Sequence, residues 1–263
     1  MPSRLDLPAP PADALDRLIA LGALDAEAIG GTVAAILPDG ISIERLTREL
    51  DGAPFTLSPA TPRDDGSVWI LRPRPVTVGG LVLAPADGPM LDGAIRLVDG
   101  SAFGTGLHPT TALCLEMLDD LLGDPPPSRV LDIGTGSGVL ARAALAKGVA
   151  HATGVDIDPM AMTDASANAR LNDVESRLTL VQGGPDRVDG AWPLVLANVL
   201  AAPLIDMAPI VVRRIAHRGR LLLSGVHESM AADVERAYVR LGMRRAWTST
   251  RDRWTAIVLD ASW

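Results

Sequence analysis

The fold of this chain is decided by one stretch, Val130-Leu131-Asp132-Ile133-Gly134-Thr135-Gly136-Ser137-Gly138. It has the pattern of a buried strand that runs into a glycine loop, with a helix expected to start near Ser137. Glycines at alternate positions let the backbone approach a ligand closely, and the start of a helix presents N–H groups that have no partner within the helix. The stretch is therefore typical of a site for a nucleotide-type cofactor.

The spacing of the glycines indicates which cofactor to expect. Gly134, Gly136 and Gly138 form the pattern GxGxG, whereas the dinucleotide fingerprint GxGxxG needs its third glycine where this chain has Val139. Glycines of a dinucleotide site cradle a pyrophosphate, and S-adenosylmethionine has no phosphate. The pattern therefore favours S-adenosylmethionine as the cofactor and disfavours an NAD-dependent oxidoreductase.

Length and composition limit the remaining possibilities. A chain of 263 residues can hold one large domain, or a catalytic domain with a smaller partner. Its formal net charge of -8 argues against nonspecific binding of nucleic acid and suits a basic protein as partner. Cys114 is the only cysteine and lies in an apolar run, so we expect a packed thiol and a cytoplasmic protein. The first residues do not resemble a signal peptide, and no uncharged stretch is long enough to cross a membrane.

Alternating strand and helix patterns from residue 129 onward predict an α/β fold. Strands are expected at 129–133, 152–156, 178–181, 194–197 and 220–224, and helices at 138–147, 159–172, 201–213 and 228–241. The segments 243–248 and 254–259 favour an antiparallel pair that closes the sheet. Together they indicate a doubly wound, mainly parallel, seven-stranded Rossmann-like sheet.

The first part of the chain has a different pattern, which indicates a smaller α+β domain. A helix is expected near 12–21, and short strands are expected at 68–71 and 76–83. The turn-rich run Ala86-Asp87-Gly88-Pro89 is the candidate boundary. We therefore expect an N-terminal domain and linker over residues 1–88 and a catalytic domain over residues 89–263.

Two carboxylates follow the second expected strand of the catalytic domain. Asp156 ends this strand, where a carboxylate can accept both ribose hydroxyls of an adenosyl group at the carboxyl edge of a parallel sheet. Alternatively, Asp156 or Asp158 caps the helix that opens at Pro159. After a GxGxG loop we assign the ribose contact to Asp156 and the cap to Asp158.

A polar side chain, Asn198, follows the fourth expected strand at the same edge. Its amide offers an acceptor and donors that could hold a substrate amine, or the amino-acid part of the cofactor, near the reactive sulfonium. The alternative is a cap for the helix that starts at Ala201. Because Asn198 occurs together with the glycine loop and Asp156, in the expected order of strands, we favour the functional role.

The segment 101–111 combines glycines with hydroxyl side chains before an apolar helix. Thr110 or Thr111 is expected to cap this helix, and the segment could also cover the cofactor and exclude water. His108 and His227 are candidate bases, although a structural or surface role is the simpler interpretation of each. The histidines have no metal-ligand spacing, so we predict no metal site.

Four stretches together resemble the PrmA family, the bacterial methyltransferases of large-subunit ribosomal protein eleven. They are 102–111 (AFGTGLHPTT), 132–138 (DIGTGSG), 154–159 (GVDIDP) and 197–201 (ANVLA), within a resemblance that covers roughly residues 94–259. The resemblance implies methylation of protein amines, chiefly Lys ε-amino groups, and an N-terminal domain that recognises the ribosomal protein. It implies that Thr111, Gly134, Asp156 and Asn198 contact S-adenosylmethionine. Residues 1–85 are shorter than expected of that domain.

The pattern and the resemblance together define a candidate site. Asn198 is the expected catalytic residue. The expected cofactor-binding residues are Phe103, Thr110, Thr111, Asp132, Gly134, Thr135, Gly136, Gly138, Asp156, Ile157 and Asn198. A methyltransferase for small molecules, or for another protein, would keep the same cofactor residues, and a binding module without catalysis is a further alternative. The expected substrate is a basic protein of the ribosome.

Overall fold

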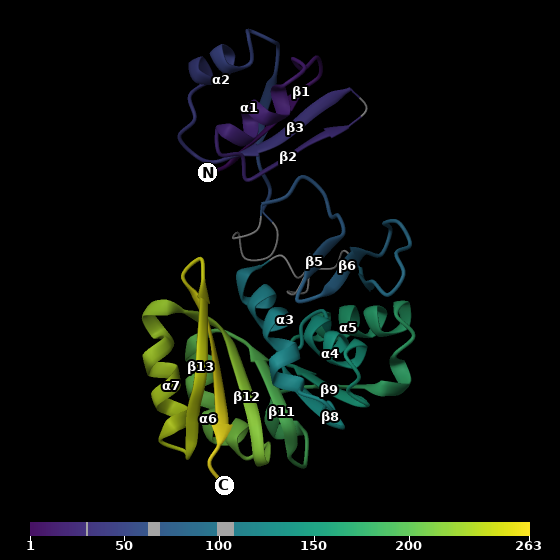
Figure 1. Cartoon of the computed structure of the whole chain (residues 1–263), viewed down its shortest axis with the longest axis vertical. Coiled ribbons are helices and arrows are strands. Elements are labelled where there is room, and N and C mark those ends of the chain that lie inside the picture. Colours follow the sequence, from purple (N-terminus) through teal and green to yellow (C-terminus); the bar gives the residue numbers. More distant parts are fainter. Residues whose placement is uncertain (30, 63–68, 99–107) are drawn as a thin grey trace. The chain divides into compact units, whose positions relative to one another are not determined.

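The computed structural model describes residues 1–29, 31–62, 69–98 and 108–263. It consists of two compact units, Met1–Pro73 and Arg74–Trp263 (Figure 1). The expected residue Phe103 lies outside the described residues.

The N-terminal unit is a four-stranded antiparallel sheet with two short helices. Its elements are β1 (Ser3–Leu7), α1 (Ala14–Ala20), β2 (Asp25–Ile29), β3 (Thr32–Leu37), α2 (Ile43–Glu49) and β4 (Thr56–Pro59), and the strand order is β2-β3-β1-β4. Leu5 of β1, Leu18 of α1 and Leu46 of α2 are buried in one apolar core. The helix expected near 12–21 is therefore the one that buries an apolar face against this sheet.

The larger unit contains the expected seven-stranded sheet. Its strands are β8 (Arg129–Ile133), β9 (His151–Asp156), β10 (Leu178–Gln182), β11 (Trp192–Asn198), β12 (Ile215–His227), β13 (Met243–Arg251) and β14 (Trp254–Ala261). Their order is β10-β9-β8-β11-β12-β14-β13, with parallel pairing from β10 to β12 and antiparallel pairing of β14 with β12 and β13. The doubly wound, mainly parallel sheet with a closing antiparallel pair is thus confirmed.

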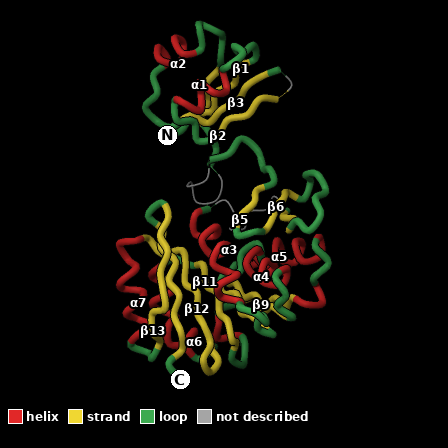
Figure 2. Tube along the Cα trace, viewed as in Figure 1, coloured by secondary structure: helices red, strands yellow, loops and turns green. Residues whose placement is uncertain are grey.

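Helices cover both faces of this sheet (Figure 2). They are α3 (Pro109–Leu122), α4 (Val139–Ala146), α5 (Pro159–Leu171), α6 (Ala201–Val212) and α7 (Ala231–Val239), with short 3-10 turns η1 (Glu175–Arg177), η2 (Pro185–Arg187) and η3 (Glu228–Met230). Successive strand residues point to opposite faces. Val130 accordingly packs with α3 and α4, whereas Leu131 packs with α6 and α7. Because both faces of the central strands are buried, the sequences of these strands are continuous apolar runs.

A small three-stranded sheet precedes α3 and corrects two expectations. Residues 76–83 are not one strand but a hairpin of β5 (Val76–Val78) and β6 (Leu81–Pro85), which turns at two glycines with φ of 56° and 69°. Such a two-residue glycine turn is a recognised hairpin signal. Strand β7 (Ile95–Leu97) then pairs with β6. Residues 69–71 form no strand, contrary to expectation.

The hairpin also explains where the two units divide. Leu83 and Ile95 belong to the same apolar core as α3 and α4, so this segment packs with the catalytic sheet. The division therefore falls after Pro73 and not at residue 88. The expected boundary at residue 88 rested on a turn-rich composition, whereas the compact units follow the burial of apolar residues.

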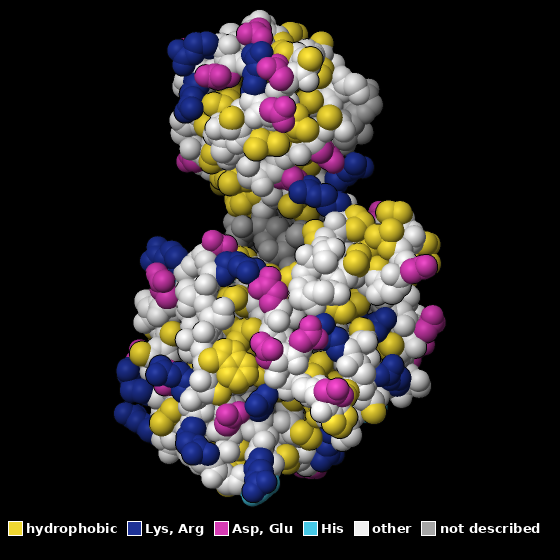
Figure 3. Space-filling view, in the orientation of Figure 1, with side chains coloured by type: hydrophobic (Ala, Val, Ile, Leu, Met, Phe, Trp, Pro, Cys, Tyr) yellow, Lys and Arg dark blue, Asp and Glu magenta, His cyan; other side chains and the backbone are white. Residues whose placement is uncertain are grey.

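Charge is unevenly distributed along the chain. Residues 1–73 contain eleven Asp and Glu against six Arg, whereas residues 209–263 contain ten Arg against five Asp and Glu. Figure 3 shows Lys and Arg side chains gathered over the edge of the catalytic unit formed by α7 and β13. The net charge of -8 therefore conceals an acidic N-terminal unit and a basic sheet edge. No helix in the described ranges has the length and apolarity to cross a membrane.

Candidate active site

The glycine loop joins β8 to α4 with its three glycines in left-handed conformations. The φ angles of Gly134, Gly136 and Gly138 are 68°, 54° and 80°. Residues with a Cβ adopt this region at a cost, which explains the alternate glycines. The helix begins at Val139, with Gly138 as its N-cap, within one residue of the expected start at 138.

The N–H groups of this loop have partners within the protein. Gly134 N and Thr135 N both donate to the carbonyl oxygen of Val155, at 2.8 and 3.0 Å, and Gly136 N donates to Asp156 Oδ2 at 2.9 Å. These three N–H groups precede the helix, and each of them is bonded to strand β9. Strand β9 holds the loop, and Asp156 is one of the groups that fix its shape.

Asp132 supports the loop from the protein interior. Its side chain is fully buried in β8, and Oδ2 accepts bonds from Thr135 Oγ1 at 2.7 Å and from Ala141 N at 3.1 Å. Oδ1 is buried without a partner among the described residues. Burial raises the pKa of this carboxyl to about 6, with a smaller contribution from the charge of Asp156. Asp132 and Thr135 are thus bonded to each other in the interior.

Asp132→Asn is expected to flatten the pH dependence of stability. The pKa of about 6 in the folded state exceeds the ordinary value of 3.8, so the folded protein binds more protons between these values and loses stability as pH rises. The variant lacks this titration. The difference in unfolding free energy between variant and wild type should shift in favour of the variant by roughly 2.4 kcal/mol between pH 4 and pH 7.

Urea unfolding of both proteins across this pH range measures the shift. Parallel pH profiles of the two proteins would contradict the raised pKa of Asp132. Thr135→Val provides a control, because it removes the bond to Oδ2 but leaves the titrating carboxyl in place.

The two carboxylates at the end of β9, Asp156 and Asp158, differ in their bonds. Asp158 is the N-cap of α5, and its Oδ1 accepts the N–H of Met160 at 2.8 Å. Asp156 accepts one backbone N–H on each oxygen, from Gly136 and from Asp158. A carboxylate oxygen has two acceptor sites, so Asp156 retains capacity for further donors. Ile157 beside it is 78% exposed, an apolar surface at the same edge.

Asn198 ends β11 at this edge and contacts the start of α3. Its Nδ2 donates to Thr111 Oγ1 at 3.3 Å, and Oδ1 is buried without a partner among the described residues. Exchanging the two amide atoms would still leave one of them unpartnered. The N-cap of α6 is Leu200, so Asn198 does not cap that helix. This excludes the structural alternative considered for Asn198.

The start of α3 is organised by His108. This buried residue is the N-cap, and its Nδ1 accepts the N–H of Thr110 at 3.3 Å and contacts Thr110 Oγ1 at 2.8 Å. Thr110 and Thr111 lie in the first turn, so neither is the cap that we expected. The Thr110 carbonyl accepts the hydroxyl of Ser224, which lies beside Asn198 in the parallel register of β11 and β12.

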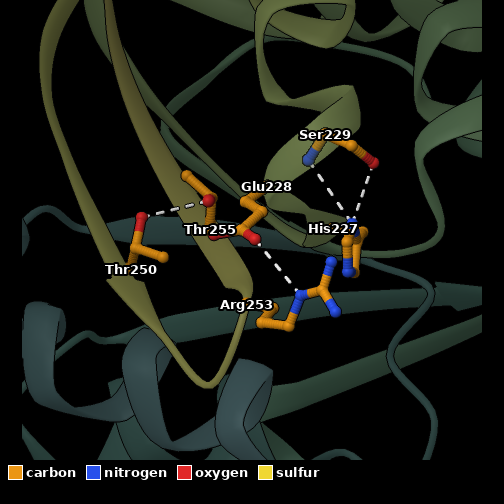
Figure 4. A network of polar contacts seen from close by, with 6 residues as sticks. All are labelled: His227, Glu228, Ser229, Thr250, Arg253 and Thr255. Carbon is orange, nitrogen blue, oxygen red and sulfur yellow. Dashed lines mark hydrogen bonds and ion pairs between the residues drawn. The ribbon is translucent and has the colours of Figure 1, made fainter.

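His227 caps the 3-10 turn that follows β12 (Figure 4). Its Nδ1 accepts the N–H of Ser229 at 3.4 Å and lies 2.8 Å from Ser229 Oγ. Next to it, Glu228 pairs with Arg253, in the turn between β13 and β14. The loop role expected for His227 is therefore the one that its bonds describe.

Three side chains that the sequence did not single out complete this edge. Trp254 lies edge-on to the rings of His108 and His227, with ring centroids 5.2 and 6.0 Å apart. Trp254 is the first residue of β14. Because β14 is antiparallel to β12, its first residue lies at the edge where the parallel strands end. Ser224 and Asn168 are the other two, and both are buried polar residues that bond to backbone. Polar residues inside apolar elements were the available signal.

Metal and thiol chemistry find no support in the described part of the chain. No cluster of three His, Cys, Asp or Glu side chains there could hold a metal ion. Cys114 is buried in α3, and burial raises the pKa of its thiol to about 12. It is the packed, unreactive thiol that was expected.

The residues at this edge fit S-adenosylmethionine in three respects. Asp156 retains acceptor capacity for ribose hydroxyls, and Ile157 offers exposed apolar surface. Asn198 has a buried amide atom without a partner within the ranges that the structure describes. A sheet of this order, with a glycine loop after β8 and a carboxylate at the end of β9, defines the class I methyltransferase fold.

Within this class, comparison with known proteins is specific. The family described as ribosomal protein L11 methyltransferase (PrmA) matches residues 64–262. The chain belongs to this family.

Named relatives and a solved structure agree with this assignment. The ribosomal protein L11 methyltransferase of Chromohalobacter salexigens is 47% identical over 169 residues, covering 63% of this chain and 55% of that protein. That of Geobacter sulfurreducens is 39% identical over 215 residues, covering 79% and 70%. The crystal structure of ribosomal protein L11 methylase from Lactobacillus delbrueckii subsp. bulgaricus matches with a TM-score of 0.62 and 30% identity, covering 68% of this chain and 93% of that one. The match thus spans about half of the first relative.

Proposed function

We propose that this protein transfers methyl groups from S-adenosylmethionine to amines of a ribosomal protein, the L11 protein, chiefly to Lys side chains. The observation that carries the proposal is the buried amide of Asn198, one atom of which has no partner in the described part of the chain, at the edge of the sheet where Asp156 also lies. Unpartnered buried polar groups are rare and costly, and one beside Asp156 at the carboxyl edge of a parallel sheet supports a ligand-binding role.

The cofactor would be held by residues around this edge. Asp156 would accept the ribose hydroxyls, and Ile157 would pack against the adenosyl group. The loop from Gly134 to Gly138 would face the amino-acid part, supported from the interior by Asp132 and Thr135. Thr111 and Asn198 would lie nearest the reacting methyl group, with Thr110 supporting them. Phe103 stays a proposed contact from the sequence resemblance alone.

The protein would promote the reaction by binding the amine of the substrate in its neutral form. The cofactor supplies an electrophilic methyl group on a sulfonium. The amine nitrogen attacks this carbon, the bond from carbon to sulfur breaks, and the proton of the methylated amine passes to solvent. A Lys amine with a pKa of about 10.4 is neutral about once in a thousand molecules near pH 7.4, which corresponds to roughly 4 kcal/mol. The Asn198 oxygen can accept an N–H of the neutral amine, and a desolvated site favours that form.

The N-terminal unit is the proposed recognition domain for the ribosomal protein. Its excess of Asp and Glu over Arg complements a basic partner. A substrate of this kind would place the activity in the cytoplasm. The basic edge at α7 and β13 belongs to the other unit, and we assign it no role in this recognition.

One experiment tests both donor and substrate. The purified protein is incubated with methyl-labelled S-adenosylmethionine and purified ribosomal protein L11, and the labelled residues are identified by peptide mass spectrometry. Label on Lys of L11 is the expected result. Cofactor binding without transfer to L11 or to a cell lysate would favour a binding module, whereas label in a small-molecule fraction would favour the alternative substrate class.

Asp156→Ala should weaken binding of S-adenosylhomocysteine, a product-state ligand, by roughly tenfold to a hundredfold. The variant loses acceptors for ribose and also the anchor of the Gly136 amide, and bonds to charged groups are worth ~1.5 to 3 kcal/mol each. Isothermal calorimetry measures the change. Asp158→Ala is the matched control, because it removes only the helix cap and should leave the affinity within about twofold.

A further inference from the structure

A single buried side chain, Asn168 of α5, joins the glycine loop to strand β7. It is 3% exposed; its Oδ1 accepts the N–H of Val98 at 2.7 Å, and its Nδ2 donates to the carbonyl of Ser137 at 2.9 Å. Both ends of the amide are thus used in bridging two backbone segments that are far apart in sequence. A buried amide that is satisfied in this way fixes the relative position of its partners.

The neighbouring asparagine one turn along α5 makes similar bonds but does not reach the loop. Asn172 Oδ1 accepts the N–H of Arg96 at 2.8 Å, and its Nδ2 donates to the carbonyls of Arg96 and Asn168, both at 2.7 Å. Both asparagines therefore bond to the β7 segment, whereas only Asn168 also bonds to the glycine loop. This difference separates a general packing role from a role at the loop.

A second contact of α5 lies at the same loop. A Cβ placed on Gly138 would stand 3.5 Å from the Cβ of Ala165, one turn before Asn168. Helix α5 thus packs against the end of the loop and also bonds to the Ser137 carbonyl within it. Because the N–H groups at 134–136 are held by β9, the loop is fixed on two sides, by β9 and by α5.

We propose that Asn168 is a positioning residue, which sets the glycine loop in its cofactor-binding conformation and couples it to β7. This inference rests on the proposed function, since it takes the loop to bind S-adenosylmethionine. Asn168 touches no reacting atom in this scheme. Its effect passes through the Ser137 carbonyl to the loop, and through the Val98 amide to β7.

Shape-matched variants of the two asparagines test the proposal. Asn168→Leu and Asn172→Leu each remove the amide bonds of one residue on the same helix, so their losses of thermal stability should be similar. S-adenosylhomocysteine should bind Asn168→Leu about tenfold more weakly than wild type, and Asn172→Leu within about twofold. The KM for S-adenosylmethionine should rise in the first variant only, with kcat changed less. Equal affinities of Asn168→Leu and wild type would overturn the proposal.

Amide hydrogen exchange provides a readout that needs no ligand. Exchange at Gly134, Thr135 and Gly136, whose N–H groups bond to β9 and Asp156, should quicken in Asn168→Leu and stay unchanged in Asn172→Leu. If wild type fails to bind S-adenosylhomocysteine, the proposed function is wrong, and this exchange pattern still decides the role of Asn168. Equal exchange at the loop in both variants would refute it.

Asn168→Asp covers the case in which Asn168→Leu does not fold. Its carboxyl can still accept the Val98 amide but can donate to the Ser137 carbonyl only when protonated. Relative to wild type, its affinity for S-adenosylhomocysteine should therefore fall as pH rises from 5 to 8. A constant ratio over this range would contradict a role for the bond to Ser137.

Discussion

Asn198→Ala should lower kcat for methyl transfer by on the order of 100-fold, the scale for removing one group that stabilises a transition state. The variant removes the buried amide atom that has no partner among the described residues, which is the proposed acceptor for the attacking amine. Affinity for S-adenosylhomocysteine should fall by no more than about fivefold, the value of one neutral hydrogen bond. Initial rates with L11 and labelled cofactor, together with calorimetry, separate the two effects.

Thr111→Val is the matched control for this prediction. It removes the hydroxyl that accepts Asn198 Nδ2 and leaves the amide itself in place. A loss of about fivefold in kcat is expected, because the amide is less firmly oriented. The double variant should resemble Asn198→Ala if Thr111 acts through Asn198. A kcat of Asn198→Ala within a few-fold of wild type would remove Asn198 from the reaction.

The strands and helices of the catalytic unit were predictable because its sheet is buried on both faces. The run at 129–133 coincides with β8, and the helix at 159–172 differs from α5 by one terminal residue. Continuous apolar runs between helical segments are produced by few folds other than a doubly wound sheet. In the region before residue 89, a half-exposed sheet and glycine turns give weaker patterns, and one expected strand became the hairpin of β5 and β6.

The candidate site was predictable in position and less so in detail. Strand order alone brought Asp156 and Asn198 to one edge, since parallel strands end on the same side of a sheet. The partners of the loop N–H groups could not be predicted, because they depend on how Val155 and Asp156 pack beneath it. The cap of α3 could not be predicted either, because threonine is favoured at the N-cap and two threonines lie close to His108, which is the actual cap.

Gly134→Ala should destabilise the protein by roughly 2 to 4 kcal/mol, from strain and overpacking together. The φ of Gly134 is 68°, and a Cβ there would stand 2.5 Å from Val199 Cγ2. Gly225→Ala should have an effect at least as large, because its φ is 79° and its Cβ would stand 2.5 Å from the carbonyl oxygen of Val199. Val199 thus lies next to both glycines. Its side chain faces Gly134, and its backbone faces Gly225.

This difference makes Val199→Ala a selective rescue. Removing the side chain clears the space beside Gly134, so Gly134→Ala combined with Val199→Ala should recover more than half of the stability lost on Gly134→Ala alone, apart from the strain of a positive φ. The same substitution cannot move the carbonyl oxygen that faces Gly225, so Gly225→Ala should not be rescued. Urea unfolding of the three single variants and the two double variants, with wild type, gives both coupling energies. Equal rescue at the two positions, or none at Gly134, would show that the loop after β8 is not packed against Val199 as the structure has it, and the placement of the glycine loop beside Asn198 would have to be revised.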